Sequence, residues 1–337
     1  MAVVRLSQLP LGKVPPELLV QRALSRLGAP RDEVIVRPSL GVDAAALAIP
    51  GGIAVVSSDP ITGAQRRAGW LAVHVACNDI AVMGAEPVGI LATILLTRSS
   101  GDSDLEQFTL DIDEACRDLG IAVLGGHTEV TSAVTQPVLM LTAMGVTDQS
   151  RLIRPGVAEV GDTLLLVGAA AIEGTAILAT EFADELSRAL GAEQVESAQQ
   201  FWREISIVAP ALAAARSGAK AMHDVTEGGV VTALDELGRA TGLGVRVNVE
   251  EIPRRAVTDA ICSHFGLDPL ALISSGALLI ATEQPTAVET AVRATGSACV
   301  AIGELVRGPS RLLTRGKSLK LIPPARDELW RFYEERL

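Results

Sequence analysis

The chain has 337 residues, of which 48% are hydrophobic and 20% are charged, and its formal net charge is −11. This composition excludes general disorder, because a disordered chain combines low hydrophobicity with high charge density, and it predicts two domains with large cores. No basic stretch stands out against the acidic background, which argues against a nucleic-acid-binding protein. Since no apolar run reaches the ~18 residues of a membrane span, we expect no association with a membrane.

The four cysteines indicate reduced thiols. Cys77, Cys116, Cys262 and Cys299 lie far apart and form no C-x-x-C pair, which argues against a zinc site and against a disulfide framework. The first 11 residues are too short and too interrupted for a secretory signal. We therefore expect a cytoplasmic protein.

Strands and helices alternate in the first part of the chain. Prolines at the start or glycines at the end of helical stretches predict helices at residues 15–28, 66–83 and 104–119. Short apolar runs predict strands at residues 34–36, 44–49, 53–57, 88–96, 121–124 and 138–146. Together they predict an α+β domain over residues 1–154.

A second α+β domain is predicted over residues 155–337, because Arg154-Pro155-Gly156 interrupts the pattern. Its predicted strands are 163–167, 219–222, 244–249, 277–281, 298–305, 311–314 and 319–322. Its predicted helices are 173–181, 207–217, 230–240, 254–265, 286–294 and 327–337. The fold class is therefore α+β, with two domains of similar size.

Two familiar phosphate-binding loops are missing from the sequence. Gly316-Lys317-Ser318 has the ending of a P-loop, but Arg311 stands where that motif requires a glycine. No G-x-G-x-x-G stretch follows a predicted strand. The sequence therefore supports neither a Rossmann nucleotide site nor a P-loop enzyme.

Six polar clusters interrupt the apolar segments. They are Gly41-Val42-Asp43, Ser57-Ser58-Asp59-Pro60, His74 with Asn78-Asp79, Gly125-Gly126-His127-Thr128-Glu129, His223-Asp224-Val225-Thr226-Glu227-Gly228-Gly229 and Ser274-Ser275-Gly276. Each alone is typical of a turn, a cap or a core histidine. Together they place carboxylates at strand ends and glycine turns, where ligand sites form. Five carboxylates suit Mg²⁺ bridging a polyphosphate: Asp43, Asp59, Asp79, Glu129 and Asp224.

Taken in order, these clusters resemble the aminoimidazole ribonucleotide synthetase (PurM) superfamily. That superfamily also includes selenophosphate synthetase, thiamine-monophosphate kinase and the hydrogenase-maturation protein HypE. The resemblance spans residues 41–304 and is greatest to HypE and HypE-like relatives. It is carried by residues 70–87, which contain A-V-H-x-x-x-N-D-I-A-V-M-G-A-x-P, and by residues 125–130, 223–229 and 268–281.

The resemblance implies a PurM-like fold in which strands of the N-terminal domain pair across a homodimer, with ATP in a groove near that interface. It implies ATP and Mg²⁺ as cofactors. The metal ligands carried over by motif are Asp43, Asp59, Asp79, Glu129 and Asp224. The nucleotide contacts would also include Asn78, Gly125, Gly126 and Thr128. Catalytic roles would fall to Asp79, Asp224 and His127.

The resemblance further implies ATP-driven phosphorylation of an amide or carbamoyl-type oxygen on an acceptor, within metalloenzyme maturation with a partner protein. HypE carries a terminal cysteine, whereas this sequence reads Glu334-Glu335-Arg336-Leu337 at its end. We therefore do not expect the protein to act as its own carrier. Two alternatives stay open: an ATP-binding maturation or scaffold partner with little catalysis, and a small-molecule kinase. Lys13 stands isolated, without the glycine-rich loop of a selenophosphate synthetase.

Overall fold

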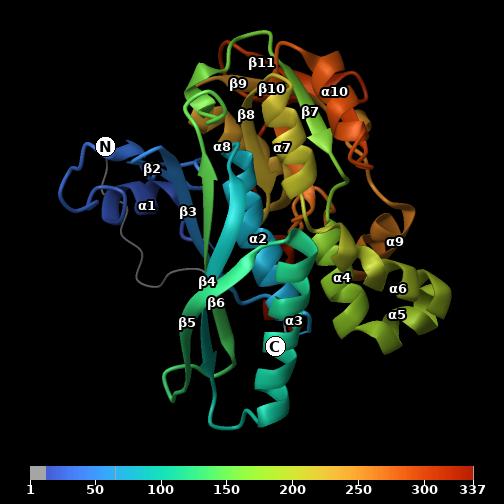
Figure 1. Cartoon of the computed structure of the whole chain (residues 1–337). Coiled ribbons are helices and arrows are strands. Elements are labelled where there is room, and N and C mark those ends of the chain that lie inside the picture. Colours follow the sequence, from blue (N-terminus) through green and yellow to red (C-terminus); the bar gives the residue numbers. More distant parts are fainter. Residues whose placement is uncertain (1–12, 65, 337) are drawn as a thin grey trace.

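The computed structural model describes residues 13–64 and 66–336, and it contains two sheets (Figure 1). The first sheet has the strand order β1-β2-β3-β6-β4-β5. Its strands are β1 (Val34–Val36), β2 (Ala45–Ile49), β3 (Gly52–Ile61), β4 (Glu86–Leu96), β5 (Ala122–Val130) and β6 (Val138–Thr147). β4 and β5 pair in parallel, and the other neighbours pair antiparallel.

Three helices accompany this sheet: α1 (Pro16–Arg22), α2 (Ala68–Val82) and α3 (Asp102–Leu119). Every residue of α2 except Val75 is buried. A helix that is apolar on all sides must be covered on all sides, and α2 packs against β3, β6 and α3 and also against the second domain (Figure 1). α2 therefore forms the junction between the two domains.

The second sheet has the strand order β13-β12-β9-β11-β7-β10-β8. Its strands are β7 (Thr163–Val167), β8 (Ala219–Val225), β9 (Gly244–Asn248), β10 (Ala277–Thr282), β11 (Cys299–Val306), β12 (Arg311–Thr314) and β13 (Lys317–Lys320). The helices are α4 (Ile172–Glu181), α5 (Ala183–Leu190), α6 (Ala192–Gln199), α7 (Val208–Arg216), α8 (Gly229–Thr241), α9 (Ala256–Phe265), α10 (Pro285–Arg293) and α11 (Glu328–Arg336). The expected two-domain α+β architecture is confirmed.

Several elements differ in extent from the prediction. α1 ends at Arg22, short of Gly28, and the prediction missed the two short helices α5 and α6. β3 continues through Asp59-Pro60 to Ile61, and β5 continues through the glycine-rich cluster to Val130. No helix in the described part of the chain is long and apolar enough to cross a bilayer.

The glycines of β5 let this strand approach β4 closely. The register between the two strands shifts between Ile90 and Leu91, which is the signature of a bulge. A Cβ on Gly126 would stand 1.8 Å from the carbonyl oxygen of Ala92, and the φ of Gly126 is +148°. The sequence pattern predicts a strand that ends before these glycines, whereas in the structure β5 continues through them to Val130.

Asn78 joins the two domains through hydrogen bonds to backbone. Its Nδ2 donates to the carbonyl oxygen of Ile205 at 3.0 Å, and its Oδ1 accepts from the N–H of Ile207 at 2.9 Å. The side chain has no exposed surface. Its amide is therefore used within the fold, and the expected contact of Asn78 with the nucleotide stays a prediction.

We predict that Asn78→Ala lowers the free energy of unfolding by about 3 kcal/mol, because it leaves the carbonyl of Ile205 and the N–H of Ile207 buried without partners. Urea denaturation measures the change. The control is Gln136→Ala, an exposed residue, which should change stability by less than about 0.5 kcal/mol. Equal stabilities of the Asn78→Ala variant and the wild type would contradict a stabilising role of these two hydrogen bonds.

The side chain of His74 is buried in α2. Neither ring nitrogen has a partner among the described residues, and the ring packs against Trp70 at a centroid distance of 4.4 Å. Burial, helped by the positive charge of Arg67, lowers the pKa of His74 to about 3. The imidazole is thus neutral at physiological pH. His74 is therefore a buried core histidine, which was one of the two interpretations of its cluster in the sequence.

Protonation of His74 should couple folding to pH. The unfolded state binds this proton below about pH 6.5 while the folded state does not, so stability falls as pH decreases from 6.5 toward 3. We predict that His74→Phe removes about 1.4 kcal/mol per pH unit of that loss. Denaturation of both proteins at pH 7.5, 6.0 and 5.0 measures the difference, and parallel curves would contradict a buried neutral histidine.

Candidate functional site

Four aspartates from both domains converge beside α2. Asp43 precedes β2, Asp59 lies on β3, Asp79 on α2 and Asp224 on β8. Ser57 connects three of them: its Oγ lies 2.5 Å from Oδ2 of Asp79, 3.3 Å from Oδ2 of Asp59 and 3.1 Å from the carbonyl oxygen of Asp43. Because alternate residues of a strand share a face, Ser57 and Asp59 both point toward α2.

The loop that carries Asp43 packs directly on α8. Gly41 has φ +72°, and a Cβ there would stand 2.2 Å from the carbonyl oxygen of Glu236. Only glycine fits this approach. The close packing brings Asp43 of the first domain to the strand that carries His223 and Asp224.

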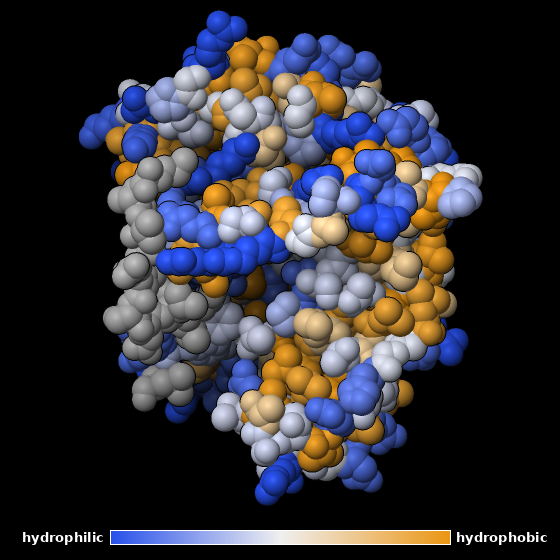
Figure 2. Space-filling view, turned by 90° about the vertical axis from the view of Figure 1, so that its left-hand side faces the viewer, coloured by the Kyte–Doolittle hydropathy of each residue, from blue (hydrophilic) through white to orange (hydrophobic). Residues whose placement is uncertain are grey.

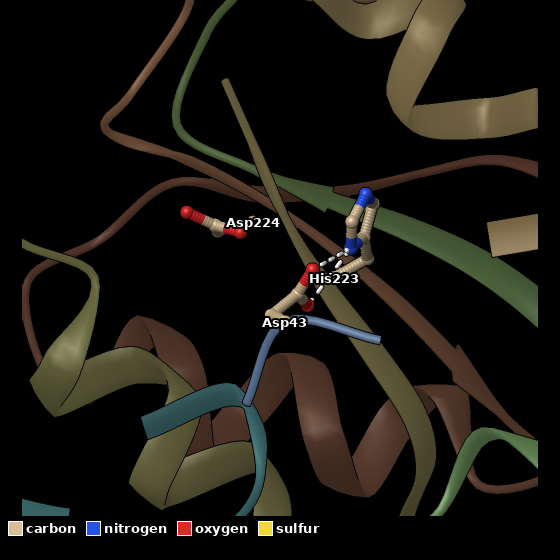
Figure 3. Close-up of side chains that lie close together, drawn as sticks. All are labelled: Asp43, His223 and Asp224. Carbon is tan, nitrogen blue, oxygen red and sulfur yellow. Dashed lines mark hydrogen bonds and ion pairs between the residues drawn. The ribbon is translucent and has the colours of Figure 1, made fainter. Parts of the chain in front are cut away.

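His223 forms an ion bridge between the two domains (Figure 3). Its Nδ1 lies 2.7 Å from Oδ1 and 2.8 Å from Oδ2 of Asp43, and its Nε2 lies 3.0 Å from Oε2 of Glu236. Burial alone would lower the pKa of His223, but Asp43 and Glu236 overcome this and raise it well above the ordinary value. The imidazolium therefore donates to a carboxylate on either side.

The remaining aspartates repel one another. Burial, followed by the charge of Asp43, raises the pKa of Asp224 to about 8. Burial, followed by the charges of Asp224 and Asp59, raises the pKa of Asp79 well above its ordinary range. Oδ2 of Asp224 is buried and has no hydrogen-bond partner among the described residues. Within the described residues, the positive charges of His223 and Lys13 therefore compensate the charge of the cluster only in part.

These residues fit a divalent cation such as Mg²⁺. Donor atoms of Asp43, His223 and Asp224 lie within 4.8 Å of one another. His223 is already bonded to Asp43 and Glu236, so carboxylate oxygens supply the available ligands, and a hard cation prefers oxygen. The unpartnered oxygen of Asp224 is an observation of the fold itself that fits a cation ligand.

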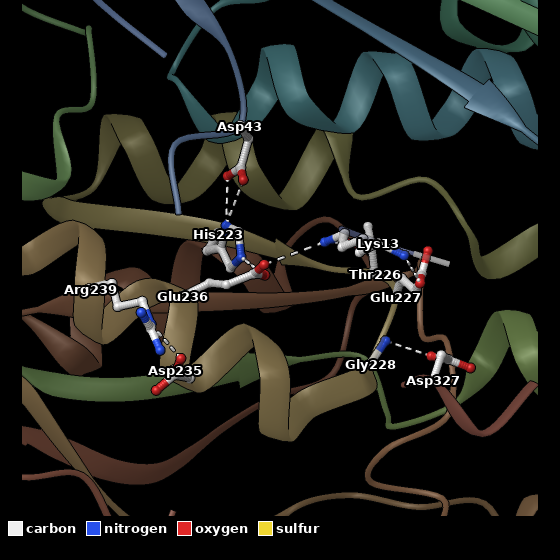
Figure 4. Close-up of polar contacts among 10 residues, drawn as sticks. All are labelled: Lys13, Asp43, His223, Thr226, Glu227, Gly228, Asp235, Glu236, Arg239 and Asp327. Carbon is white, nitrogen blue, oxygen red and sulfur yellow. Dashed lines mark hydrogen bonds and ion pairs between the residues drawn. The ribbon is translucent and has the colours of Figure 1, made fainter. Parts of the chain in front are cut away.

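Several residues at the site were missed by sequence reasoning (Figure 4). Glu236 contacts His223, Lys13 contacts the turn after β8, and Oδ2 of Asp327 accepts the N–H of Gly228 at 2.5 Å. Burial raises the pKa of Asp327 to about 7. No local motif marks these residues, because each meets its partner only through the tertiary fold.

The glycine-rich cluster on β5 does not join the aspartates within one chain. Asp59 pairs with Leu141, Leu141 with Ala92 and Ala92 with Gly126, so three strand spacings, roughly 14 Å, separate Asp59 from β5. The cluster lies exposed at the sheet edge, and His127 Nε2 lies 3.3 Å from Oε2 of Glu129. Within one chain, this cluster therefore lies apart from the aspartates. The nucleotide, metal and catalytic roles expected for its residues stay predictions: Gly125, Gly126, His127, Thr128 and Glu129.

The Ser274-Ser275-Gly276 cluster has structural contacts. Oγ of Ser274 accepts the N–H of Ala171 at 2.7 Å, and the N–H of Ser275 donates to Oε2 of Glu173 at 3.3 Å. Both serines are buried. This cluster therefore stabilises the start of α4.

Two family models match the chain. The model described as AIR synthase related protein, N-terminal domain, matches residues 41–147, and the model for the C-terminal domain of the same proteins matches residues 159–313. Carbamoyl dehydratase HypE of Azotobacter vinelandii is 30% identical over 249 residues, which cover 70% of this chain and 69% of that protein.

Solved structures share the fold of this chain. A crystal structure of Escherichia coli HypE, a hydrogenase maturation protein, is similar with a TM-score of 0.71 and 25% identity, covering 83% of this chain and 88% of that one. HypE in complex with ATP gives a TM-score of 0.67 at 21% identity (95% and 98% covered), and a HypE–HypF complex gives 0.70 at 20% (83% and 93%). The chain is therefore a HypE-like member of the AIR synthase related family.

Proposed function

We propose that the protein is a Mg-ATP-dependent enzyme that phosphorylates an amide or carbamoyl-type oxygen. The observation that carries this proposal is the convergence of Asp43, Asp59, Asp79 and Asp224 at the domain junction. A triphosphate alone would be repelled by this cluster, because like charges destabilise each other strongly where water is excluded. Cation and nucleotide together would satisfy the site.

The aspartates named above would hold the Mg²⁺. When bound, it would neutralise charge on the phosphate oxygens, which is its usual contribution to phosphoryl transfer. The chain's own groups prepare the site. His223 fixes the orientation of Asp43, and Ser57 holds Asp79 and Asp59 on the same side of β3. Preorganised groups avoid reorganisation during the reaction.

A carbamoyl acceptor follows from the similarity to carbamoyl dehydratase HypE. The carbonyl oxygen of an S-carbamoyl thiol would attack the terminal phosphorus of ATP, so that an O–P bond forms, the bond to ADP breaks and ADP leaves. The phosphorylated oxygen would then leave as phosphate while the nitrogen loses two protons, which yields a thiocyanate. A solved complex of HypE with HypF supports a partner protein for this chain.

A homodimer is part of the proposal. On the face of the first sheet away from α2, the side chains of Leu91, Met140, Met144 and Val146 are between 36% and 49% exposed. Figure 2 shows hydrophobic side chains gathered on the lower half of this side of the molecule. An apolar face beside the unpaired edge of β5 suits a second copy of the chain, because contiguous exposed apolar surface marks interaction sites.

We predict that the protein with Mg²⁺, ATP and an S-carbamoyl thiol releases ADP and phosphate, and that Asp224→Asn reduces this rate about 100-fold. The variant removes the carboxylate with the unpartnered oxygen. Chelation of Mg²⁺ should abolish the rate as well. Coupled detection of ADP measures it.

The control is Asp235→Asn on α8, whose carboxylate pairs with Arg239 at 2.6 Å (Figure 4). It should keep the wild-type rate. A wild-type rate of ADP release in Asp224→Asn would contradict the assignment of the aspartate cluster as the Mg-ATP site. ATP binding without ADP release, for every carbamoyl and amide acceptor tried, would instead favour the scaffold alternative.

For the dimer, we predict that Leu91→Glu converts the protein to a monomer, because a charge in an apolar interface is costly to bury. Sedimentation equilibrium at micromolar concentration measures the mass. Val157→Glu, at an exposed position of the second domain, is the matched control and should leave a dimer. A wild-type protein that sediments as a monomer would refute the homodimer.

A further inference from the structure

Lys13 reaches from the N-terminal segment to the turn that follows β8 (Figure 4). Its backbone N–H donates to Oε1 of Glu227 at 2.7 Å. Its ammonium Nζ lies 3.4 Å from Oγ1 of Thr226 and 3.5 Å from Oε1 of Glu236. The residue that stands isolated in the sequence thus lies beside the aspartate cluster.

Carboxylates dominate the surroundings of this ammonium. Burial alone would lower the pKa of Lys13, but Glu236, Glu227, Asp224 and Asp43 together raise it. The side chain is therefore a cation at neutral pH. Its charge in turn lowers the pKa of Asp224, against the larger effects of burial and of Asp43.

The backbone of Lys13 is held firmly, whereas its ammonium is held loosely. Distances of 3.4 Å and 3.5 Å exceed those of good hydrogen bonds, and half of the side-chain surface (50%) is exposed. His223, in contrast, makes contacts of 2.7–3.0 Å and is 4% exposed. A lysine head on a flexible four-carbon stem can therefore change partners, while the imidazolium of His223 stays fixed.

We propose that the ammonium of Lys13 binds the terminal phosphate of the nucleotide. This assignment rests on the proposed function, because it needs a triphosphate at the aspartate cluster. The terminal phosphate offers an exposed cation a stronger partner than the distant oxygens of Thr226 and Glu236. A nucleoside diphosphate lacks that group, so Lys13 would distinguish ATP from ADP.

The test is calorimetric binding of Mg²⁺ with β,γ-methylene ATP, and of Mg²⁺ with ADP, to the wild type and to Lys13→Gln. The variant keeps the backbone N–H that anchors Glu227. We expect the triphosphate analogue to bind about 10-fold more weakly or worse, since a hydrogen bond to a charged group is lost, and ADP to bind within 2-fold of the wild type. Lys13→Arg keeps the charge and should recover part of the loss.

The charge-matched control is Lys317→Gln on the exposed strand β13, which should bind both nucleotides like the wild type. Equal weakening for the analogue and for ADP would overturn the assignment and leave Lys13 with a structural role at the turn. Unchanged binding of both nucleotides would overturn it as well. A wild type that binds neither nucleotide would refute the proposed function itself, and the Lys13 assignment with it.

Discussion

Repulsion among buried carboxylates is the constraint on which the site depends. Asp79 and Asp224 lie at the junction of two domains, where burial and neighbouring charges raise the pKa values of both. Within the described residues, His223 and Lys13 compensate this charge in part. A fold that brings acids together in this way gains from any ligand that delivers cations, and this supports the proposal that the site takes a Mg-nucleotide complex.

The same constraint links function to the arrangement of the domains. Asp43 and Asp79 belong to the first domain, while His223 and Asp224 belong to the second, so the site exists only while the domains keep their contact. Burial of α2 on all sides and the amide of Asn78 maintain that contact. A change that destabilises the contact between the domains should therefore also disrupt the site.

Much of the secondary structure and the four aspartates of the site could be predicted from sequence, because short local patterns mark them. Apolar runs and terminal glycines predicted most strands and helices of both domains, and the four aspartates lie in short motifs. Glu236 and Lys13 could not be found, since they meet His223 and Thr226 only through contacts distant in the chain. The glycines of β5 predict a turn as readily as a bulge, and the spacing of Asn78 cannot tell a ligand contact from a backbone clamp.

The most direct test of a Mg-nucleotide site at the four aspartates is electron paramagnetic resonance of Mn²⁺, a substitute for Mg²⁺, with the protein and β,γ-methylene ATP. We predict that the wild type binds Mn²⁺ in the presence of the analogue, that Mg²⁺ displaces it, and that Asp224→Asn loses this binding. Binding of the analogue without bound Mn²⁺, or equal Mn²⁺ binding in the variant, would contradict the account.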